Sequence, residues 1–220
     1  MNFVQVAIPS PLRQTFTYKN QFSSNLVGKR VLVEFGRRKL VGIVTSQSEN
    51  FDDDYKLKQI EEVLDDSPLI DKQLLKKINN ISDYYMHPIG IVFESFIPSF
   101  LRKAKHQKTL EKYETKINSD KTFNNLHTLT RDQKNVLNSI KSKDSGEILL
   151  SGITSSGKTE VYKHFIKELL NKGKSALVLV PEIFLTPQIF NDFQNTFGNK
   201  VLLNHSGLTP IQRIKVWLAS

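Results

Sequence analysis

The chain has 220 residues, 39% of them apolar, and its formal net charge is +9. It contains no cysteine, which excludes disulfides and thiolate zinc sites within these residues. No apolar run is long enough to cross a bilayer, and the first residues lack the basic stretch and apolar run of a signal peptide. The sequence therefore predicts a cytoplasmic protein without a membrane partner.

The positive charge is spread over the whole chain. Residues 1–105 carry 15 basic and 12 acidic side chains, and residues 106–220 carry 16 and 10. Because phosphate contacts dominate the affinity of proteins for nucleic acids, this balance favours a nucleic-acid partner. A lysine-rich proteome would produce the same balance, so charge alone does not decide between the two interpretations.

The first 105 residues predict a small β-rich domain. Asp71 lies near the start of an expected helix over 71–87, and 88–90 ends it. One face of that helix would carry Leu74, Ile78, Ile81 and Tyr85. A Gly-led turn at 36–39 joins two of the expected strands. Short runs rich in β-branched residues predict strands at 3–8, 30–35, 40–44 and 60–64.

The remainder changes character. Residues 106–125 are polar and lysine-rich and predict a linker. From 126 to 220 helical and strand patterns alternate, which is typical of an α/β fold with a parallel sheet. Strands are expected at 147–150, 175–180 and 200–203, and helices at 130–141, 158–172, 186–197 and from 210 onward. Residues 126–220 therefore predict a parallel sheet covered by helices on both faces.

A phosphate-binding loop is the strongest motif. It matches G-x-x-x-x-G-K-[ST], lies between an expected strand and an expected helix, and predicts binding of ATP or a close relative. Lys158 would contact the β- and γ-phosphates, and the Thr159 hydroxyl would bind Mg²⁺, so these two are the candidate catalytic residues. The loop consists of Gly152, Ile153, Thr154, Ser155, Ser156, Gly157, Lys158 and Thr159.

By itself this loop does not choose among kinases, GTPases, transporter ATPases and helicases. The sequence around it resembles the PriA family of bacterial replication-restart DNA helicases. In the second half the resemblance rests on 153–162, on 179–183 with 185–188, and on 205–208 with Arg213 and Trp217. In the first half it rests on 6–9, 16–18, 35–36, 62–65 and 84–90. A small-molecule kinase with the same kind of loop is a further alternative, but it has no evident need for the stretch at 181–188.

The resemblance implies the amino-terminal part of an ATP-dependent 3′→5′ DNA helicase that recognises stalled forks and initiates primosome assembly. It also implies that residues 126–220 form an incomplete RecA-like P-loop helicase lobe with a parallel sheet. Residues 1–105 would bind the 3′ end of a DNA strand in a pocket with Phe16, Tyr18, Gly36 and Lys58. An aromatic ring can stack on a terminal base, and a lysine can hold a phosphate. The two aromatic residues could equally be core residues of a strand, and Lys58 an ordinary solvated lysine.

Further roles follow from the same resemblance. Gln133 would contact adenine, although Thr130 and Gln133 also satisfy the capping-box pattern. Pro181, Glu182 and Thr186 would line the path of the DNA. Forked or single-stranded DNA, the primosome and single-strand-binding proteins are the implied partners. ATP and Mg²⁺ are the implied cofactors, and zinc is not expected in these residues.

The sequence departs from the family pattern in three places. Thr17 stands where the family commonly has an acidic residue, and a threonine is a weaker acceptor for a 3′-hydroxyl. Residues 106–125 are too few for the family's winged-helix domain. The acidic Asp-Glu motif, the second motor lobe and the zinc-binding cysteines are absent from these 220 residues.

We therefore expect a fragment or truncated product that binds ATP and DNA but does not unwind DNA. The alternative is a fork-DNA-binding module with a vestigial nucleotide site. Residues 126–220 are expected to be marginally stable, because a partial parallel sheet leaves an unpaired edge.

Overall fold

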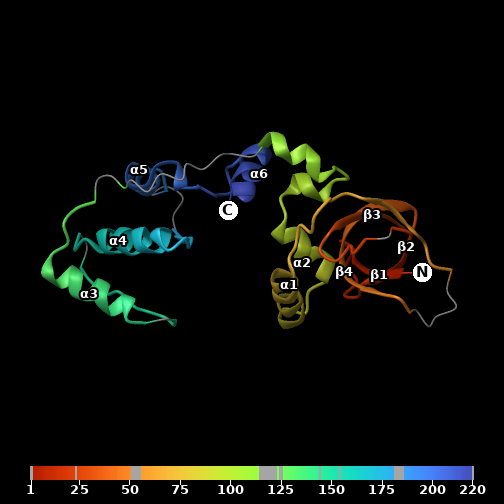
Figure 1. Ribbon diagram of the computed structural model, residues 1–220, viewed down its shortest axis with the longest axis horizontal. Coiled ribbons are helices and arrows are strands. Elements are labelled where there is room, and N and C mark those ends of the chain that lie inside the picture. The colour runs from red at the N-terminus through yellow and green to blue at the C-terminus, as the bar shows by residue number, and fades with distance from the viewer. Residues whose placement is uncertain are drawn as a thin grey trace. The chain divides into compact units, whose positions relative to one another are not determined.

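The computed structural model describes residues 2–22, 24–50, 56–113, 123, 126–143, 145–153, 155–180 and 186–219 (Figure 1). The chain forms two compact units. The first unit comprises Met1–Thr115 and Leu208–Leu218, and the second comprises Lys116–Gly207 and Ala219–Ser220. The first unit thus continues past residue 105, because Leu110 is buried in its core.

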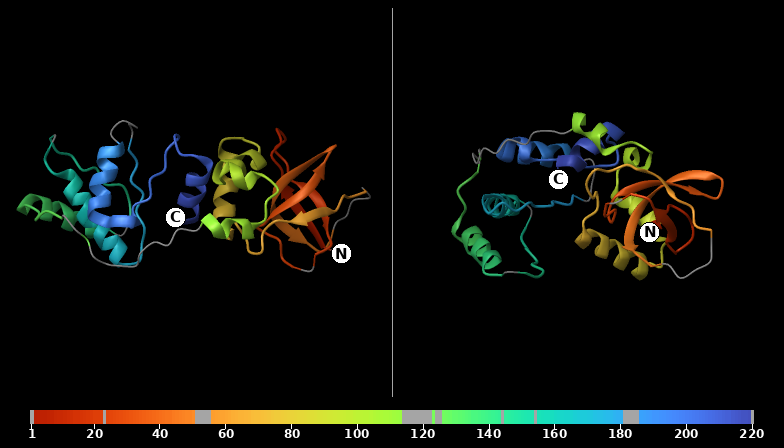
Figure 2. Two further views of the ribbon diagram at one scale, coloured as in Figure 1. Left: turned by 90° about the horizontal axis from the view of Figure 1, so that it is seen from above. Right: turned by 45° about the vertical axis from the view of Figure 1, so that its right-hand side comes forward.

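The first unit is built on one antiparallel sheet whose strand order is β2-β1-β4-β3-β5. The sheet curls until its two edges meet, which Figure 2 shows from two further directions. At the seam the amide of Lys19 donates to the carbonyl oxygen of Lys58 at 2.9 Å, and Lys19 pairs with Gln59. The strands are β1 (Asn2–Ala7), β2 (Phe16–Asn20), β3 (Arg30–Phe35), β4 (Arg38–Ser48) and β5 (Ile60–Val63).

Alternation along the strands fills the inside of this curled sheet. Successive strand side chains point to opposite faces, so every second residue faces inward. On β3, for example, Val31 and Val33 are buried while Glu34 is exposed. The β3–β4 hairpin turns through Gly36 and Arg37, and the positive φ of 61° at Gly36 suits glycine.

A buried ion pair ties the sheet to the chain that follows it. The Nε of Arg30 lies 3.1 Å from both carboxylate oxygens of Asp65, and both side chains are fully buried. The other guanidinium nitrogens donate to the carbonyl oxygens of Leu101 at 2.8 Å and Lys105 at 3.1 Å. Arg30 therefore satisfies backbone groups as well as the carboxylate, as a buried charge requires.

Two helices and two 3₁₀ turns complete this part of the first unit: α1 (Lys72–Tyr84), α2 (Ile89–Phe96), η1 (Ser99–Arg102) and η2 (Gln107–Tyr113). Asp71, expected near the start of this helix, is the N-cap of α1, and its side chain accepts from the amide of Leu74 at 2.7 Å. The helix ends earlier than predicted, because Met86 adopts a positive φ of 49°. Tyr85 is the C-cap of α1 and is 71% exposed, so it does not extend the face on which Ile78 is fully buried.

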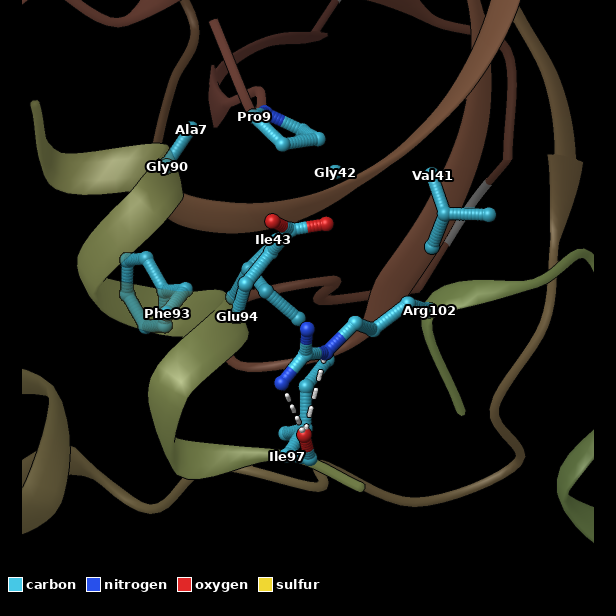
Figure 3. A pocket seen from close by; sticks show the side chains of 10 residues that line it. All are labelled: Ala7, Pro9, Val41, Gly42, Ile43, Gly90, Phe93, Glu94, Ile97 and Arg102. Carbon is cyan, nitrogen blue, oxygen red and sulfur yellow. Dashed lines mark hydrogen bonds between the residues drawn. The ribbon is translucent and has the colours of Figure 1, made fainter. Parts of the chain in front are cut away.

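Helix α2 packs directly against β1 and β4. A Cβ atom added at Gly90 would lie 1.8 Å from the carbonyl oxygen of Ile8, so only glycine allows this approach. Figure 3 shows the contact between α2 and the strands, where a cavity of about 10 Å³ remains beside Phe93 and Glu94. That volume holds at most one water molecule, so the contact between α2 and the strands is a packing contact rather than a ligand site.

We expect Gly90→Ala to destabilise the first unit by about 1–3 kcal/mol, because the new methyl group must displace backbone. Urea unfolding followed by circular dichroism measures the change. Ser95→Ala, on an exposed position of the same helix, is the matched control and should change stability by less than about 0.5 kcal/mol. Equal midpoints for the two variants would contradict the close packing.

In the second unit the predicted helices are confirmed. They are α3 (Arg131–Lys141), α4 (Lys158–Asn171) and α5 (Thr186–Phe197), followed by the 3₁₀ turn η4 (Gly198–Lys200). Helix α6 (Pro210–Ala219) also forms where predicted, but its residues up to Leu218 belong to the first unit. There Ile214 is fully buried, and the indole of Trp217 donates to the carbonyl oxygen of Phe96 at 3.3 Å.

The predicted parallel sheet is not confirmed. Among the described residues of the second unit, 147–150, 175–180 and 201–203 form no strand. Leu149, Leu177 and Leu179 are 93%, 84% and 83% exposed, respectively. A strand exists only through hydrogen bonds to a neighbouring strand, so an apolar pattern alone cannot form the sheet.

A buried lysine joins α4 to α5. The Nζ atom of Lys163 donates to Glu160 at 3.1 Å and to Asp192 at 2.6 Å. Burial alone would lower the pKa of Lys163, but the hydrogen bonds to the two carboxylates raise it above its usual value. The lysine therefore stays charged and fixes α5 against the helix that follows the phosphate loop.

Candidate nucleotide and nucleic-acid sites

The phosphate loop has the backbone expected of an anion-binding turn. Gly157, the N-cap of α4, has a φ of 79°, and Ser155 has a φ of 62°. Helix α4 follows at once, so its positive end and its first free amides face the loop. Thr159, the predicted Mg²⁺ ligand, is exposed in the first turn of α4, and Thr154 lies outside the described residues.

Lys158 holds the loop in its present conformation. Its Nζ atom donates to the carbonyl oxygens of Gly152 at 2.7 Å and Ile153 at 3.0 Å. The ammonium group is thus held by main-chain oxygens of the loop, at an exposed position. Binding of a phosphate would exchange these neutral acceptors for charged ones, which form stronger hydrogen bonds.

The side chain of Gln133 contacts both the N-cap residue of α3 and the phosphate loop. Its Oε1 accepts from the amide of Thr130 at 2.9 Å, and Thr130 Oγ1 accepts from the amide of Gln133, which completes a capping box. Its Nε2 also donates to the carbonyl oxygen of Ser156 at 3.0 Å. The capping-box interpretation is confirmed, and the cap places the Gln133 amide against the phosphate loop, whereas contact with adenine stays a prediction.

Two residues of α4 that the sequence analysis did not single out support this arrangement. Glu160 accepts from the amide of His127 at 3.3 Å, and a ring nitrogen of His164 lies 3.0 Å from the carbonyl oxygen of His127. They therefore tie the segment before α3 to the helix of the loop. Their i, i+4 spacing on one face of α4 was the available signal.

In the first unit, Lys58 and Phe16 contact residues at the end of β3 and in the turn that follows it. We call these residues the hairpin cluster: Phe16, Glu34, Phe35, Gly36 and Lys58. Lys58 donates to Glu34 Oε1 at 2.7 Å and to the carbonyl oxygen of Gly36 at 3.1 Å. The rings of Phe16 and Phe35 meet edge to face with centroids 4.7 Å apart. The fold therefore brings predicted site residues from three separate stretches of the chain to one place.

Tyr18 is part of the core in this structure. It is 4% exposed, and its hydroxyl donates to the carbonyl oxygen of Glu34 at 3.1 Å. Burial, together with the negative charge of Glu34, raises the pKa of Tyr18 to about 12. Tyr18 therefore supports Glu34 from within, whereas the half-buried Phe16 retains accessible ring surface.

The other predicted DNA-contacting residues belong to the second unit. Pro181 and Glu182 lie outside the described residues. Thr186 is the first residue of α5. The hairpin cluster and the phosphate loop lie in different units, so each is a separate candidate site.

Comparison with known proteins assigns the chain to a family. Residues 5–98 match the model of the PriA 3′ DNA-binding domain. Replication restart protein PriA of Treponema pallidum (strain Nichols) is 30% identical over 98% of this chain. The protein of the same name from Haemophilus influenzae is 28% identical over 99% of it. The chain belongs to the PriA family.

The second unit has its own match within this PriA-family chain. Residues 126–213 match a model described as type III restriction enzyme, res subunit. The Bacillus subtilis (strain 168) replication restart protein PriA is 39% identical over 55% of this chain and 16% of its own length. The chain spans 33% of the Treponema relative and 40% of the Haemophilus relative, about a third of their length.

None of the described helices is long and apolar enough to span a membrane. The residues that the structure describes contain no group of three or more histidine, cysteine, aspartate or glutamate side chains placed to hold a metal ion.

Proposed function

We propose that the first unit binds the 3′ end of a DNA strand and that the second unit binds ATP, as part of a protein that restarts replication at stalled forks. The observation that carries the proposal is the hairpin cluster inside the region that matches a 3′ DNA-binding domain. We propose ATP-dependent unwinding and primosome assembly only for a protein as long as these relatives, of which this chain spans about a third.

The chemistry of the hairpin cluster supports DNA binding. Phe16 and Phe35 offer ring surface to a base, and base stacking on aromatic side chains tolerates any sequence. Lys58 and the main-chain groups around Gly36 offer polar contacts to the sugar and phosphate. An end-binding site needs such contacts on one nucleotide rather than along a groove.

The chemistry of the phosphate loop supports nucleotide binding. Gly157 begins a helix of 14 residues, and Lys158 is already placed within the loop. The main-chain amides, Lys158 and the Thr159 hydroxyl would hold the phosphates and Mg²⁺. Gln133 would meet the base from α3, since its amide already contacts the loop.

The test of DNA-end binding uses fluorescent forked DNA with a free leading-strand 3′ end, compared with the same fork carrying a 3′-phosphate. Fluorescence anisotropy at two salt concentrations gives both affinities. We expect the blocked fork to bind several-fold more weakly at both concentrations.

Equal binding of the two forks, lost at the higher salt, would mean that only the charge of +9 acts. End recognition by the first unit would then be withdrawn.

A further inference from the structure

The hairpin cluster contains a carboxylate that the sequence analysis did not consider. Glu34 lies on β3 just before the turn, and its side chain is 47% exposed. Lys58, which is 46% exposed, donates to its Oε1 atom. A carboxylate has two oxygens and about four acceptor positions, so one lysine contact leaves capacity for a further donor.

Hydrogen bonds fix both the main chain and the side chain of Glu34. The carbonyl oxygen of Glu34 accepts from the buried hydroxyl of Tyr18. Glu34 directly follows Val33, the last residue of β3 that pairs with β5. Its carboxylate is held by Lys58, whose second contact is the carbonyl oxygen of Gly36. Lys58 thus holds the partly exposed carboxylate at the turn after β3, next to the main chain of Gly36.

Thr17, by contrast, is occupied elsewhere. It pairs with Gln5 across β1 and β2, and Gln5 Nε2 donates to its hydroxyl oxygen at 2.8 Å. The other end of that amide accepts from Thr15 at 3.0 Å. Thr17 is also neutral, so it cannot distinguish a hydroxyl from a phosphate by charge.

We infer that Glu34 determines the specificity of the first unit for a 3′-hydroxyl over a 3′-phosphate. The inference rests on the proposed function, namely that this unit binds a DNA 3′ end. The carboxylate accepts a hydrogen bond from the terminal hydroxyl, and its negative charge repels a terminal phosphate. Lys58 holds the acid in place through its hydrogen bond to Oε1.

The ionisation of Glu34 supports this role. The hydrogen bond from Lys58 and the positive charge of that lysine lower the pKa of Glu34. The side chain is therefore an anion near neutral pH, and it acts as an acceptor only. A terminal hydroxyl can donate to such a group, whereas a phosphate ester dianion has no proton to offer.

The test measures the affinities of the full chain for one forked DNA ending in a 3′-hydroxyl or a 3′-phosphate. We expect the unchanged chain to prefer the hydroxyl by roughly tenfold, as one charge-assisted hydrogen bond implies. Glu34→Gln should bring this preference close to one, because the phosphate end gains Lys58 as a partner while the hydroxyl end loses its anionic acceptor.

Two matched variants separate this role from general effects. Thr17→Val removes the hydroxyl but keeps the shape, and it should leave the preference unchanged. Glu49→Gln removes one exposed carboxylate just after β4, and it should raise the affinity for both ends slightly and equally. Circular dichroism melting confirms that each variant is folded before its affinities are compared.

The outcomes distinguish the inference from the proposed function. If the unchanged chain prefers the hydroxyl end and Glu34→Gln keeps that preference, Glu34 only anchors Lys58 and the inference is wrong. A preference lost in Thr17→Val would also overturn it. If the unchanged chain shows no preference, both the end-binding function and the role of Glu34 fail together.

Discussion

Replacing Arg30 with methionine is expected to destabilise the first unit by about 3–5 kcal/mol, which is typical of removing one partner of a buried ion pair. Asp65 would remain fully buried without its counter-charge. The carbonyl oxygens of Leu101 and Lys105 would lose their donors as well. Thermal unfolding followed by circular dichroism should show a midpoint lower by roughly 10 °C or more.

Two further variants test whether the loss comes from the unpaired charge. The double variant Arg30→Met with Asp65→Leu should recover part of the stability, because no buried charge remains. Lys39→Ala breaks the pair with Glu61, in which the lysine side chain is 65% exposed, and should cost less than about 1 kcal/mol. A single Arg30 variant as stable as the Lys39 variant would show that the buried pair contributes little.

The strands of the first unit were largely predictable because their signal is local. The strand predicted at 30–35 is the observed β3, and three others differ only at their ends. Strand β2 was offered only as the alternative interpretation of Phe16 and Tyr18, since they alternate with polar residues over only five positions. Helix α2 was missed because Pro88 and Gly90 were interpreted as helix breakers. In the fold Pro88 is the N-cap, and Gly90 permits close packing.

The second unit shows where local information ends. Its helices were predicted because the signals lie within a few residues of each end, as in the capping box at Thr130 and the positive φ of Gly173 and Gly198. The sheet depends instead on pairing between distant segments. An apolar run such as 175–180 has the composition of a buried strand, but its composition says nothing about which neighbour it pairs with.

The candidate sites divide in the same way. The phosphate loop is contiguous, so its residues were predicted from one motif. The hairpin cluster depends on the curl of the sheet, which carries Lys58 to the turn after β3 through the seam with Lys19. Glu34 was not singled out, because only this curl reveals that an ordinary strand glutamate contacts Lys58.

Lys158→Ala is expected to weaken ATP binding by roughly ten- to a hundredfold, the effect of losing one or more hydrogen bonds between a charged donor and a phosphate. Lys158 is the one side-chain ammonium that the described residues place inside the loop, where it contacts Gly152 and Ile153. Titration with a fluorescent ATP analogue in the presence of Mg²⁺ measures the loss. Because these two contacts are exposed, the melting temperature should change little.

The matched control is Lys172→Ala, which removes the same charge at the C-terminal end of α4. Since both variants lower the net charge equally, a general electrostatic effect would weaken ATP binding to the same degree in each. A loss confined to Lys158→Ala places the phosphates at the N-terminal end of α4, where the helix dipole and the free amides also favour an anion. An equal loss in both variants would contradict that position, and Gln133 would then have no base to contact from α3.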